Sequence, residues 1–455
     1  MAEKRKTMRG ASASLAALAL MIAAALAPGT ALARPGALDR SFGDNGRVVT
    51  RTSLGGAGWL NARLDLAEGP DGTIVAAAGD SVFRYLPDGA LDPTFGEAGR
   101  TTIATEFEGM PFSLHAVAVD SQGRIYALGE VEIADVKAPT SYMGAWIHPP
   151  LAAVARYTAD GRLDTSYASG KGYLLTDLGQ PATYGSAVSY RSALTSLAAG
   201  RIDTADNLVA TASIGGFPCS VGHSELSMFR RLIVRLTPDG GLDPSFGGGS
   251  GTETIAALDA IGATALSTAG EIAFAGRRAT NCGKDTVYRL GRLSADGALD
   301  PRFGREGLRP LPAEAVAISL DRFGRTIVLL PGRRLLRLTP AGRADRRFGR
   351  KGHAYLSLPG ANPNSVIVEP SGRILLTGGS FPHSFAVTRL NGRGYPDRHF
   401  GRRGLATTGF GKYVGALAKA AFIDRHGRLV VGGTMAESDT SHIGGIALAR
   451  YRLGR

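Results

Sequence analysis

The stretch that decides the fold is Arg84-Tyr85-Leu86-Pro87-Asp88-Gly89-Ala90-Leu91-Asp92-Pro93-Thr94-Phe95-Gly96, followed by Gly99. Its pattern is Arg followed by Tyr or Leu, a Gly five residues after the Arg, an Asp three residues after that Gly, and an aromatic residue three residues further on. Five more complete copies occur at Arg156…Asp164…Tyr167, Arg235…Asp243…Phe246, Arg292…Asp300…Phe303, Arg337…Asp345…Phe348 and Arg389…Asp397…Phe400. Self-similarity on this scale indicates a repeat architecture.

A seventh copy is divided between the two ends of the chain. Its second half is Gly36-Ala37-Leu38-Asp39-Arg40-Ser41-Phe42-Gly43, and its first half is Ala449-Arg450-Tyr451. An open array has no reason to divide one motif in this way, whereas in a ring the two ends meet and complete the last unit. Closure also removes exposed strand edges.

A second motif, a Gly or Asn turn followed by an apolar run, lies between successive copies of the first. The turn residues are Gly72, Gly123, Asn207, Gly270, Gly324, Gly372 and Gly427. Gly and Asn accept the positive φ of a tight hairpin, and the run after them predicts a short buried strand. Each unit therefore contains four short strands, which need about 40–45 residues in known propeller blades.

We predict an all-β fold, a seven-bladed β-propeller of four-stranded blades that is closed by the two termini. The predicted domain is 34–455, with units at roughly 46–98, 99–171, 172–250, 251–306, 307–351, 352–403 and 404–455, and with 34–45 completing the last unit. A β-solenoid is the alternative, although its coils are usually shorter and more regular. No amphipathic helical period is found after residue 33, which disfavours helical repeats.

The recurring Arg and Asp are expected to be structural, because a group that is repeated in every blade serves the blade. An Asp after a turn Gly can accept backbone N–H groups, and an Arg eight residues earlier can clamp that Asp. We expect these pairs within ion-pairing distance, with the aromatic residue packed under the turn between neighbouring blades. The pairs are Arg84 and Asp92, Arg156 and Asp164, Arg235 and Asp243, Arg292 and Asp300, Arg337 and Asp345, Arg389 and Asp397, and Arg450 and Asp39.

These motifs resemble the delta-60 repeat family, whose units resemble propeller blades. The resemblance covers nearly all of residues 35–455, and the Gly-x-Leu-Asp-x-x-Phe-Gly signature is specific when it is repeated. The chain departs from it at Tyr167-Ala168, at Ala344 and at Pro396. The resemblance implies the fold and a bacterial surface or secreted setting, and it implies no reaction, because the family is largely uncharacterised.

The N-terminus predicts a signal peptide over residues 1–33. Basic residues from Lys4 to Arg9 precede an apolar segment at 11–27, and Ala31-Leu32-Ala33 has the small residues of a cleavage site. A retained anchor is the alternative. We expect a secreted, periplasmic or envelope-associated protein, with no membrane-spanning segment once the signal is removed.

The chain has 52 Lys and Arg against 39 Asp and Glu, a formal net charge of +13. Such an excess favours polyanionic surroundings such as nucleic acid or an acidic envelope polymer, although a soluble surface that prefers Arg is the favoured explanation. The Arg residues are spread over the repeats, and the densest stretch, Arg333 to Lys351, lies within one repeat. We therefore do not expect a nucleic-acid partner.

Strand alternation divides the connections between two faces. We call the face with the Gly hairpins and Asp–Phe turns the uniform face, and the opposite one, with loops of unequal length, the variable face. Tyr142, Met143, Trp146 and His148 lie in the longest variable loop, 130–150, and suggest an aromatic platform for a sugar or peptide, or else a loop packed on itself. Three histidines of other variable loops, His223, His383 and His442, have no close ligand spacing, so no metal is assigned.

Two cysteines, Cys219 and Cys282, fall in variable loops of neighbouring blades and suggest one disulfide between them. The chain has no G-x-S-x-G, H-E-x-x-H or P-loop motif, and no cofactor is expected. Carboxylates such as Glu106, Glu130 and Glu437 lie in loops.

Three functions are compatible with this sequence. The first is an exported module that binds a protein, glycan or acidic polymer through the variable face. The second is an extracellular carbohydrate hydrolase or lyase, which needs two carboxyl groups facing each other at the central funnel. The third is a polyanion binder, which needs one contiguous basic patch and binding that weakens with salt.

Overall fold

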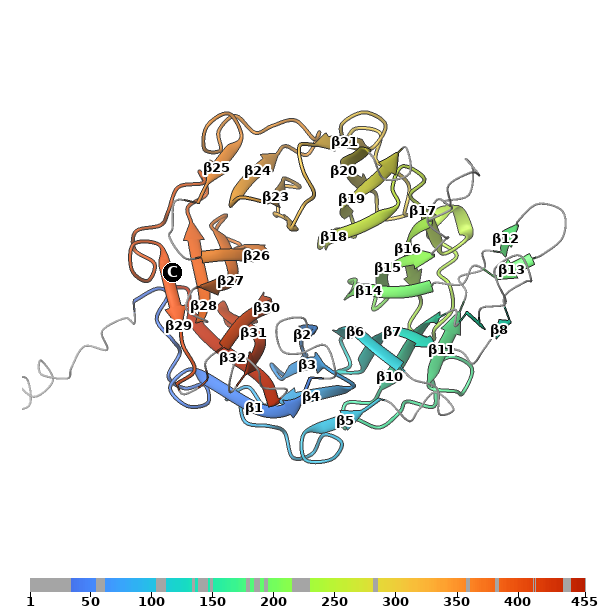
Figure 1. The fold of residues 1–455 in the computed structure, drawn as a ribbon, viewed down its shortest axis with the longest axis horizontal. Coiled ribbons are helices and arrows are strands. Elements are labelled where there is room, and N and C mark those ends of the chain that lie inside the picture. Colours follow the sequence, from blue (N-terminus) through green and yellow to red (C-terminus); the bar gives the residue numbers. More distant parts are fainter. Residues whose placement is uncertain are drawn as a thin grey trace, which may run out of the picture.

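The chain forms a seven-bladed β-propeller around a central channel (Figure 1). The computed structural model describes residues 34–54, 62–103, 112–132, 136–137, 146–147, 150–176, 181–183, 189–191, 195–214, 230–280, 285–356, 361–380, 384–411, 413, 415–436 and 443–454. In this part of the chain no helix is long and apolar enough to cross a membrane.

Each blade is one antiparallel sheet of four strands that follow one another from the channel outwards. Blade 1 is β2 (Leu64–Glu68), β3 (Ile74–Ala78), β4 (Ser81–Tyr85) and β5 (Arg100–Thr102); blade 2 is β6 (Phe112–Val119), β7 (Ile125–Glu132), β10 (Pro150–Tyr157) and β11 (Tyr173–Thr176); blade 3 is β14 (Thr195–Ile202), β15 (Leu208–Ile214), β16 (Arg230–Leu236) and β17 (Thr252–Thr254); blade 4 is β18 (Ala260–Leu266), β19 (Ile272–Thr280), β20 (Asp285–Leu293) and β21 (Leu308–Leu311).

The remaining blades continue in the same order. Blade 5 is β22 (Ala317–Leu320), β23 (Thr326–Leu330), β24 (Arg334–Leu338) and β25 (His353–Tyr355); blade 6 is β26 (Ala361–Val368), β27 (Ile374–Ser380), β28 (Ser384–Leu390) and β29 (Leu405–Thr408); blade 7 is β30 (Gly415–Ile423), β31 (Arg428–Ala436), β32 (Ile443–Arg452) and β1 (Arg47–Ser53). Two short hairpins, β8 (Val136–Lys137) with β9 (Trp146–Ile147) and β12 (Pro181–Thr183) with β13 (Ser189–Arg191), and a 3-10 turn at Gly247–Gly249 lie outside the blades.

The two ends of the chain share blade 7, as the divided motif predicts. Strand β1 pairs antiparallel with β32 over seven residue pairs, from Arg47 opposite Ala449 to Ser53 opposite Ile443. In Figure 1 the blue β1 lies beside the red β32. The N–H of Gly36 also donates to the carbonyl of Arg452 at 2.7 Å, so the closure is made by a strand and by the turn before it.

The sheets are offset by one strand from the repeat units described above. The strand after each Phe-Gly turn pairs with the strand before that turn, for example β5 with β4. The Asp–Phe turn is therefore a connection within a sheet, and the following loop leads to the inner strand of the next blade. The uniform and variable faces follow from the alternation, with the Gly hairpins and Asp–Phe turns together at one end of every sheet.

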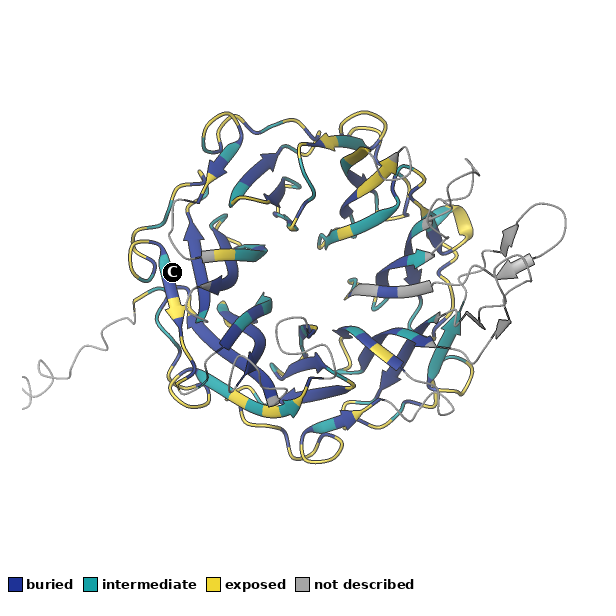
Figure 2. Cartoon of the chain, viewed as in Figure 1, coloured by how far each residue is buried: buried dark blue, intermediate teal, exposed yellow. Residues whose placement is uncertain are grey.

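The core lies between neighbouring blades. The central strands β3 and β23 are buried on both faces, because each sheet is covered by another on either side, and such strands read as continuous apolar runs rather than alternating ones. One cluster joins Ile327 and Leu335 of blade 5 to Leu376 and Leu390 of blade 6. Figure 2 shows this layer of buried strands, with exposed residues gathered in the peripheral turns.

Glycines in the second strands allow the inner strands of four blades, 2, 4, 6 and 7, to bulge close to them. A Cβ at Gly129 would lie 1.9 Å from the Ser113 carbonyl oxygen, and one at Gly378 would lie 2.0 Å from that of Asn362. The register shifts beside these contacts, as at Leu114/Ala116. A bulge increases the local twist of a strand, so the glycines that end the apolar runs serve the curvature of the inner strands.

The closure makes a test of the ring. A chain that begins at residue 54 lacks β1 and Asp39, and it should melt on the order of 10 °C below the 34–455 chain, because it loses a strand and a buried ion pair. Adding a peptide of residues 34–53 should restore part of the difference in a calorimetric scan. Equal melting temperatures for the two chains would show that the closure does not stabilise the ring.

Candidate functional site

Arg84 shows what the recurring motif does in one blade. It is buried at the end of β4, and its Nε donates to Oδ2 of Asp92 at 2.8 Å. Its guanidinium carbon lies 5.0 Å from the centre of the Phe95 ring, a cation–π contact. The other carboxylate oxygen of Asp92 accepts the N–H of Thr94 at 2.9 Å, so one Asp holds both the turn and the buried cation.

The same arrangement occurs in six of the seven blades. The Nε–Oδ2 distances of the further pairs are 2.7 Å for Arg156–Asp164, 2.6 Å for Arg235–Asp243, 2.9 Å for Arg337–Asp345, 3.0 Å for Arg389–Asp397 and 2.9 Å for Arg450–Asp39. The last pair joins residues 411 positions apart.

Blade 4 is the exception. Arg302 occupies Asp300 with both ends of its guanidinium, Nε to Oδ1 at 2.9 Å and Nη2 to Oδ2 at 3.3 Å. Arg292 is turned away from the Asp, and its buried Nε has no hydrogen-bond partner. In blades 1, 2, 3 and 7 a Ser or Thr stands where Arg302 stands, and its hydroxyl bridges the Asp and the Arg, as Thr94 does.

Six of the seven buried arginines, all but Arg84, also donate to a backbone carbonyl of the next blade, which the sequence did not indicate. Nη1 of Arg235 donates to the carbonyl of Ala295 at 2.5 Å, and Nη1 of Arg337 to that of Gly392 at 2.5 Å. Arg450 reaches the carbonyl of Pro87 and so connects the last blade to the first. A charged donor with carbonyl and carboxylate partners makes stronger hydrogen bonds than a neutral one.

Two further contacts accompany every junction. The N–H after the aromatic residue donates to a carbonyl in the next blade's turn, as from Gly96 to Asp160 at 2.8 Å. The Gly of that turn lies on the aromatic ring, and a Cβ at Gly161 would be 2.9 Å from Cε2 of Phe95. At the closure Gly401 donates to the carbonyl of Pro35 at 2.8 Å, so residues 35–36 replace a turn of the repeat.

Asp39 is the most heavily used of these carboxylates. Besides Arg450, it lies 3.2 Å from Arg428 and 3.1 Å from Arg452. Burial raises the pKa of Asp39, but hydrogen bonds from Ser41 and Arg452 and the charge of Arg450 outweigh burial and lower its pKa to about 2. The carboxylate therefore stays ionised over most of the acid range.

The central channel encloses a cavity of about 800 Å³, lined by inner strands of blades 1, 3, 4, 5, 6 and 7. Two carboxylates occur among its described lining residues. Asp65 accepts the N–H of Val117 at 3.1 Å and lies 3.7 Å from Nη1 of Arg201. Asp203 accepts the N–H groups of its own hairpin, from Ala205 at 2.8 Å and Asn207 at 3.0 Å. Both are engaged within the protein, so the described lining offers no pair placed for glycoside hydrolysis.

His115 joins the inner strands of blades 2 and 3. Its Nδ1 lies 3.0 Å from the carbonyl of Leu197, which can only accept, so Nδ1 carries the proton. Burial, and next the charge of Arg63, lower the pKa of His115 to about 4. Glu130 lies 3.6 Å from Nε2, too far for a hydrogen bond, and His115 is neutral at physiological pH. We assign it to the packing of the two strands.

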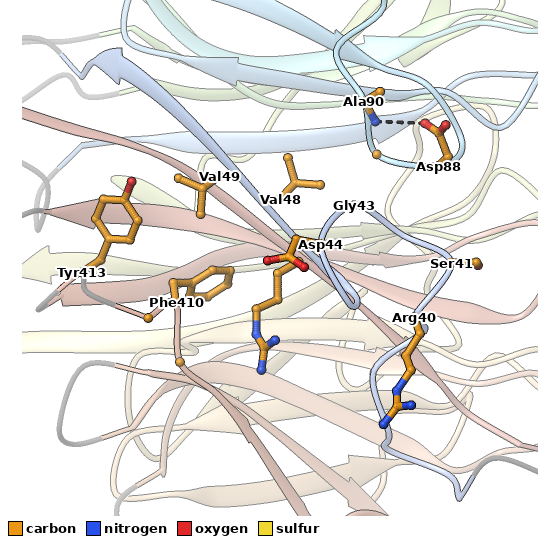
Figure 3. Close-up of a pocket in the computed structure, with 14 residues that line it drawn as sticks. Arg40, Ser41, Gly43, Asp44, Val48, Val49, Asp88, Ala90, Phe410 and Tyr413 are labelled. Atoms are coloured by element: carbon orange, nitrogen blue, oxygen red, sulfur yellow. Dashed lines mark hydrogen bonds between the residues drawn. The ribbon is translucent and has the colours of Figure 1, made fainter.

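A second cavity, of about 850 Å³, follows the outer strand β1 where the chain closes (Figure 3). Arg40 and Asp44 of the N-terminal turn line it, together with Val49, Phe410 and Tyr413. Phe410 packs edge-on against Phe385 with ring centres 4.8 Å apart. The aromatic side of the cavity thus belongs to the core between blades 6 and 7.

Most of the variable-loop residues singled out in the sequence lie outside the described residues. These are Tyr142, Met143, His148, Cys219, Cys282, His223, His383 and His442. Trp146 has its backbone in β9, and its side chain is outside the described part. The aromatic platform and the disulfide remain predictions.

Residues 69–95 and 229–246 match a family model described as "Domain of unknown function (DUF5122) beta-propeller". Both segments end at the aromatic residue of an Asp–Phe turn, Phe95 and Phe246. The match supports a β-propeller repeat family. No curated protein matches the sequence.

Many solved structures are similar to the chain, and three of them illustrate how distant the similarity is. A chain of the mitotic checkpoint complex has 10% identity, with 94% of both chains covered and a TM-score of 0.45. XC5397 of Xanthomonas campestris, described as a gluconolactonase, has 16% identity, with 73% of this chain and 91% of that chain covered and a TM-score of 0.34. BBS1N in complex with ARL6DN has 11% identity, with 93% and 98% covered and a TM-score of 0.41. These values assign no activity to the chain.

Replacing Asp39 by Asn should lower the free energy of unfolding at pH 7 by about 3 kcal/mol, because it leaves the buried Arg450 without its carboxylate. The native pKa of Asp39 lies below that of the unfolded chain, so its contribution is present above about pH 4. The contribution disappears as the pH falls through about 2.

Urea unfolding at pH 7 and at pH 2.5 measures the difference in the free energy of unfolding between the unaltered chain and Asp39→Asn. This difference should be smaller at pH 2.5. Asp44→Asn, in the same turn but exposed, is the control, with a change within about 0.5 kcal/mol. A difference that stays constant between the two pH values would contradict the role given to this carboxylate.

Replacing Arg302 by Ser should restore the Arg292–Asp300 pair and raise the free energy of unfolding by about 1 kcal/mol, because a buried donor regains its acceptor. Urea unfolding at neutral pH measures this increase in the free energy of unfolding. Arg347→Ser is the matched control, since Arg347 holds the same position in blade 5, where Arg337 and Asp345 are already paired. A loss of stability in Arg302→Ser would show that Arg302 supports the turn.

Proposed function

We propose that the protein is an exported interaction scaffold that binds a macromolecular partner, a protein or a glycan, through its variable face. The observation that carries the proposal is the contrast between the two faces of one ring. On the uniform face the Asp follows the Arg by eight residues in the six copies that are continuous in sequence, and every Asp–Phe turn donates one backbone N–H to the turn of the next blade.

On the variable face the connections between second and third strands differ from blade to blade. The connection is residues 79–80 in blade 1 and 331–333 in blade 5, but 215–229 in blade 3. In blade 2 it runs from 133 to 149 and carries the additional hairpin β8–β9. Recognition on rigid scaffolds is concentrated in such loops, and the long ones lie on neighbouring blades.

The N-terminal sequence supports the export part of the proposal. The basic residues, the apolar segment 11–27 and the small residues Ala31-Leu32-Ala33 have the order of a secretory signal. The resemblance of the motifs to delta-60 repeats agrees with a bacterial surface or secreted setting. The secreted, periplasmic or envelope location is part of this proposal.

Loop replacement tests the proposal. Three variants of the 34–455 chain replace 134–149, 181–191 or 215–229 by short Gly-Ser links, and Trp146→Ala removes one aromatic side chain. Binding to a glycan array and to immobilised envelope proteins should fall at least tenfold in one of the loop variants, about 1.4 kcal/mol, with the melting temperature unchanged.

Asp160→Asn, on the uniform face, is the control and should bind as the unaltered chain does. If the three loop variants all bind with unchanged affinity, the variable face is not the binding surface. If the unaltered chain binds no glycan and no protein, the scaffold role itself is contradicted.

A further inference from the structure

The uniform face has one geometry but two signs of charge. The residue before the Gly that lies on the aromatic ring is an exposed Asp in blades 1 to 4, namely Asp88, Asp160, Asp239 and Asp296. The same position holds Ala341 in blade 5 and Arg393 in blade 6. Because the turns superimpose in their contacts, the change is one of side chains and not of fold.

The basic part is formed by three successive turns, residues 302–305, 343–351 and 393–403. We call their exposed Arg and Lys side chains the basic crescent. These segments expose two, five and four such side chains, respectively. Their two carboxylates are bound inside the turns, Asp345 to Arg337 and Asp397 to Arg389, and the neighbouring Glu306 is exposed.

Hydrogen bonds between blades make the crescent continuous. Gly304, beside Arg305, donates its N–H to the carbonyl of Ala341 at 3.1 Å. Gly349, beside Arg350, donates to the carbonyl of Arg393 at 2.8 Å. The basic turns of blades 4, 5 and 6 are therefore in direct contact along the rim.

The cations of the crescent are available to a ligand. Among the described residues, only Arg302 of this set lies within 4.0 Å of a carboxylate, that of Asp300. Tyr395 stands between Arg393 and Arg398 and is 54% exposed. Nearby on the same face, Phe323 is 57% exposed, with the guanidinium carbons of Arg322 and Arg325 at 4.7 and 5.0 Å from its ring centre.

Two of the charges stand where the backbone disfavours them. Lys351 and Arg403 both have a φ of 55°, in the left-handed region that costs an L-residue roughly 1–2 kcal/mol. Blade 7 has Asn45 at the same position, a residue that tolerates this conformation better. The turn would accept Gly or Asn there, so the fold does not require the charges.

We propose that the basic crescent binds a linear polyanion, a chain of closely spaced phosphate or carboxylate groups. Arg forks bind such groups in bidentate fashion. A chain can follow the rim of blades 4 to 6, whereas a flat anionic surface would also meet the acidic turns of Asp88, Asp160 and Asp239 on the same face. The proposal concerns the face opposite to the variable loops and does not depend on the function proposed above.

The test uses the 34–455 chain, with inorganic polyphosphate of on the order of 10² phosphates as the probe. Fluorescence anisotropy measures the binding from 50 to 300 mM salt. Binding should weaken steeply with salt, because a polyanion releases counterions. The double variant Lys351→Gly/Arg403→Gly removes two charges and relieves two strained positions, so it should melt no lower than the unaltered chain. Its log–log salt slope should be shallower by about two.

A matched pair separates the crescent from net charge. Arg343→Glu and Arg162→Glu change the same repeat position, in blades 5 and 2, and alter the net charge equally. Only Arg343→Glu should weaken binding, by about tenfold. Equal losses in both variants, or no binding of polyphosphate at 50 mM salt, would overturn the proposal. Binding to anionic vesicles without binding to polyphosphate would also overturn it, in favour of a membrane surface.

Discussion

A guanidinium group that is buried between two β-sheets needs hydrogen-bond acceptors, and six of the seven blades meet that need with the Asp of their own motif. Arg337 is buried and has Asp345 at 2.9 Å, the Phe348 ring at 4.6 Å and a carbonyl of the next blade at 2.5 Å. One side chain thus fixes the turn of its own blade and the distance to its neighbour. Because an unpaired buried charge costs several kcal/mol, the contact specifies the geometry even where its net stabilisation is small.

The pairing of a buried guanidinium with a carboxylate also explains how the ring closes. Blade 7 obtains its Arg from the C-terminal strand and its Asp from the N-terminal turn, and Pro35 and Gly36 take the place of a repeat turn under Phe400. Neither half of the motif is satisfied without the other. The two chain ends are therefore held by the same contacts that join any two blades, and by seven residue pairs between β1 and β32 in addition.

The fold could be predicted from the sequence because the repeat is defined by the number of residues between its Arg, Gly, Asp and aromatic positions, and these spacings can be read directly from the sequence. The eight residues from Arg84 to Asp92 and the split copy at the chain ends predicted the ion pairs and the closure. The exception of Arg292 could not be predicted, because it depends on a competition between Arg302 and Arg292 for one carboxylate. The hydrogen bond from Arg235 to Ala295 depends on how far one sheet stands from the next.

The sequence also did not indicate which basic residues are buried and paired and which are exposed. Arg333 to Lys351 reads as one dense stretch, yet Arg337 is buried and paired, whereas Arg346, Arg347 and Arg350 are exposed. Strand position decides the difference, since Arg337 lies on β24 and the others follow it in the turn. Average composition therefore gave a correct sum of charges and no indication that one face of the ring carries two signs.

A ring built from one repeated contact leaves its exposed turn positions unconstrained. The buried Arg, Asp, aromatic residue and Gly recur at every junction, whereas the exposed residue before the Gly varies from Asp to Ala to Arg. Asp88, Ala341 and Arg393 occupy one position without altering the hydrogen bonds that join the blades, at 2.6, 3.1 and 2.8 Å. Charge at this position can consequently change from blade to blade while the contacts that join the blades are kept, and two parts of a single face can differ in the sign of their charge.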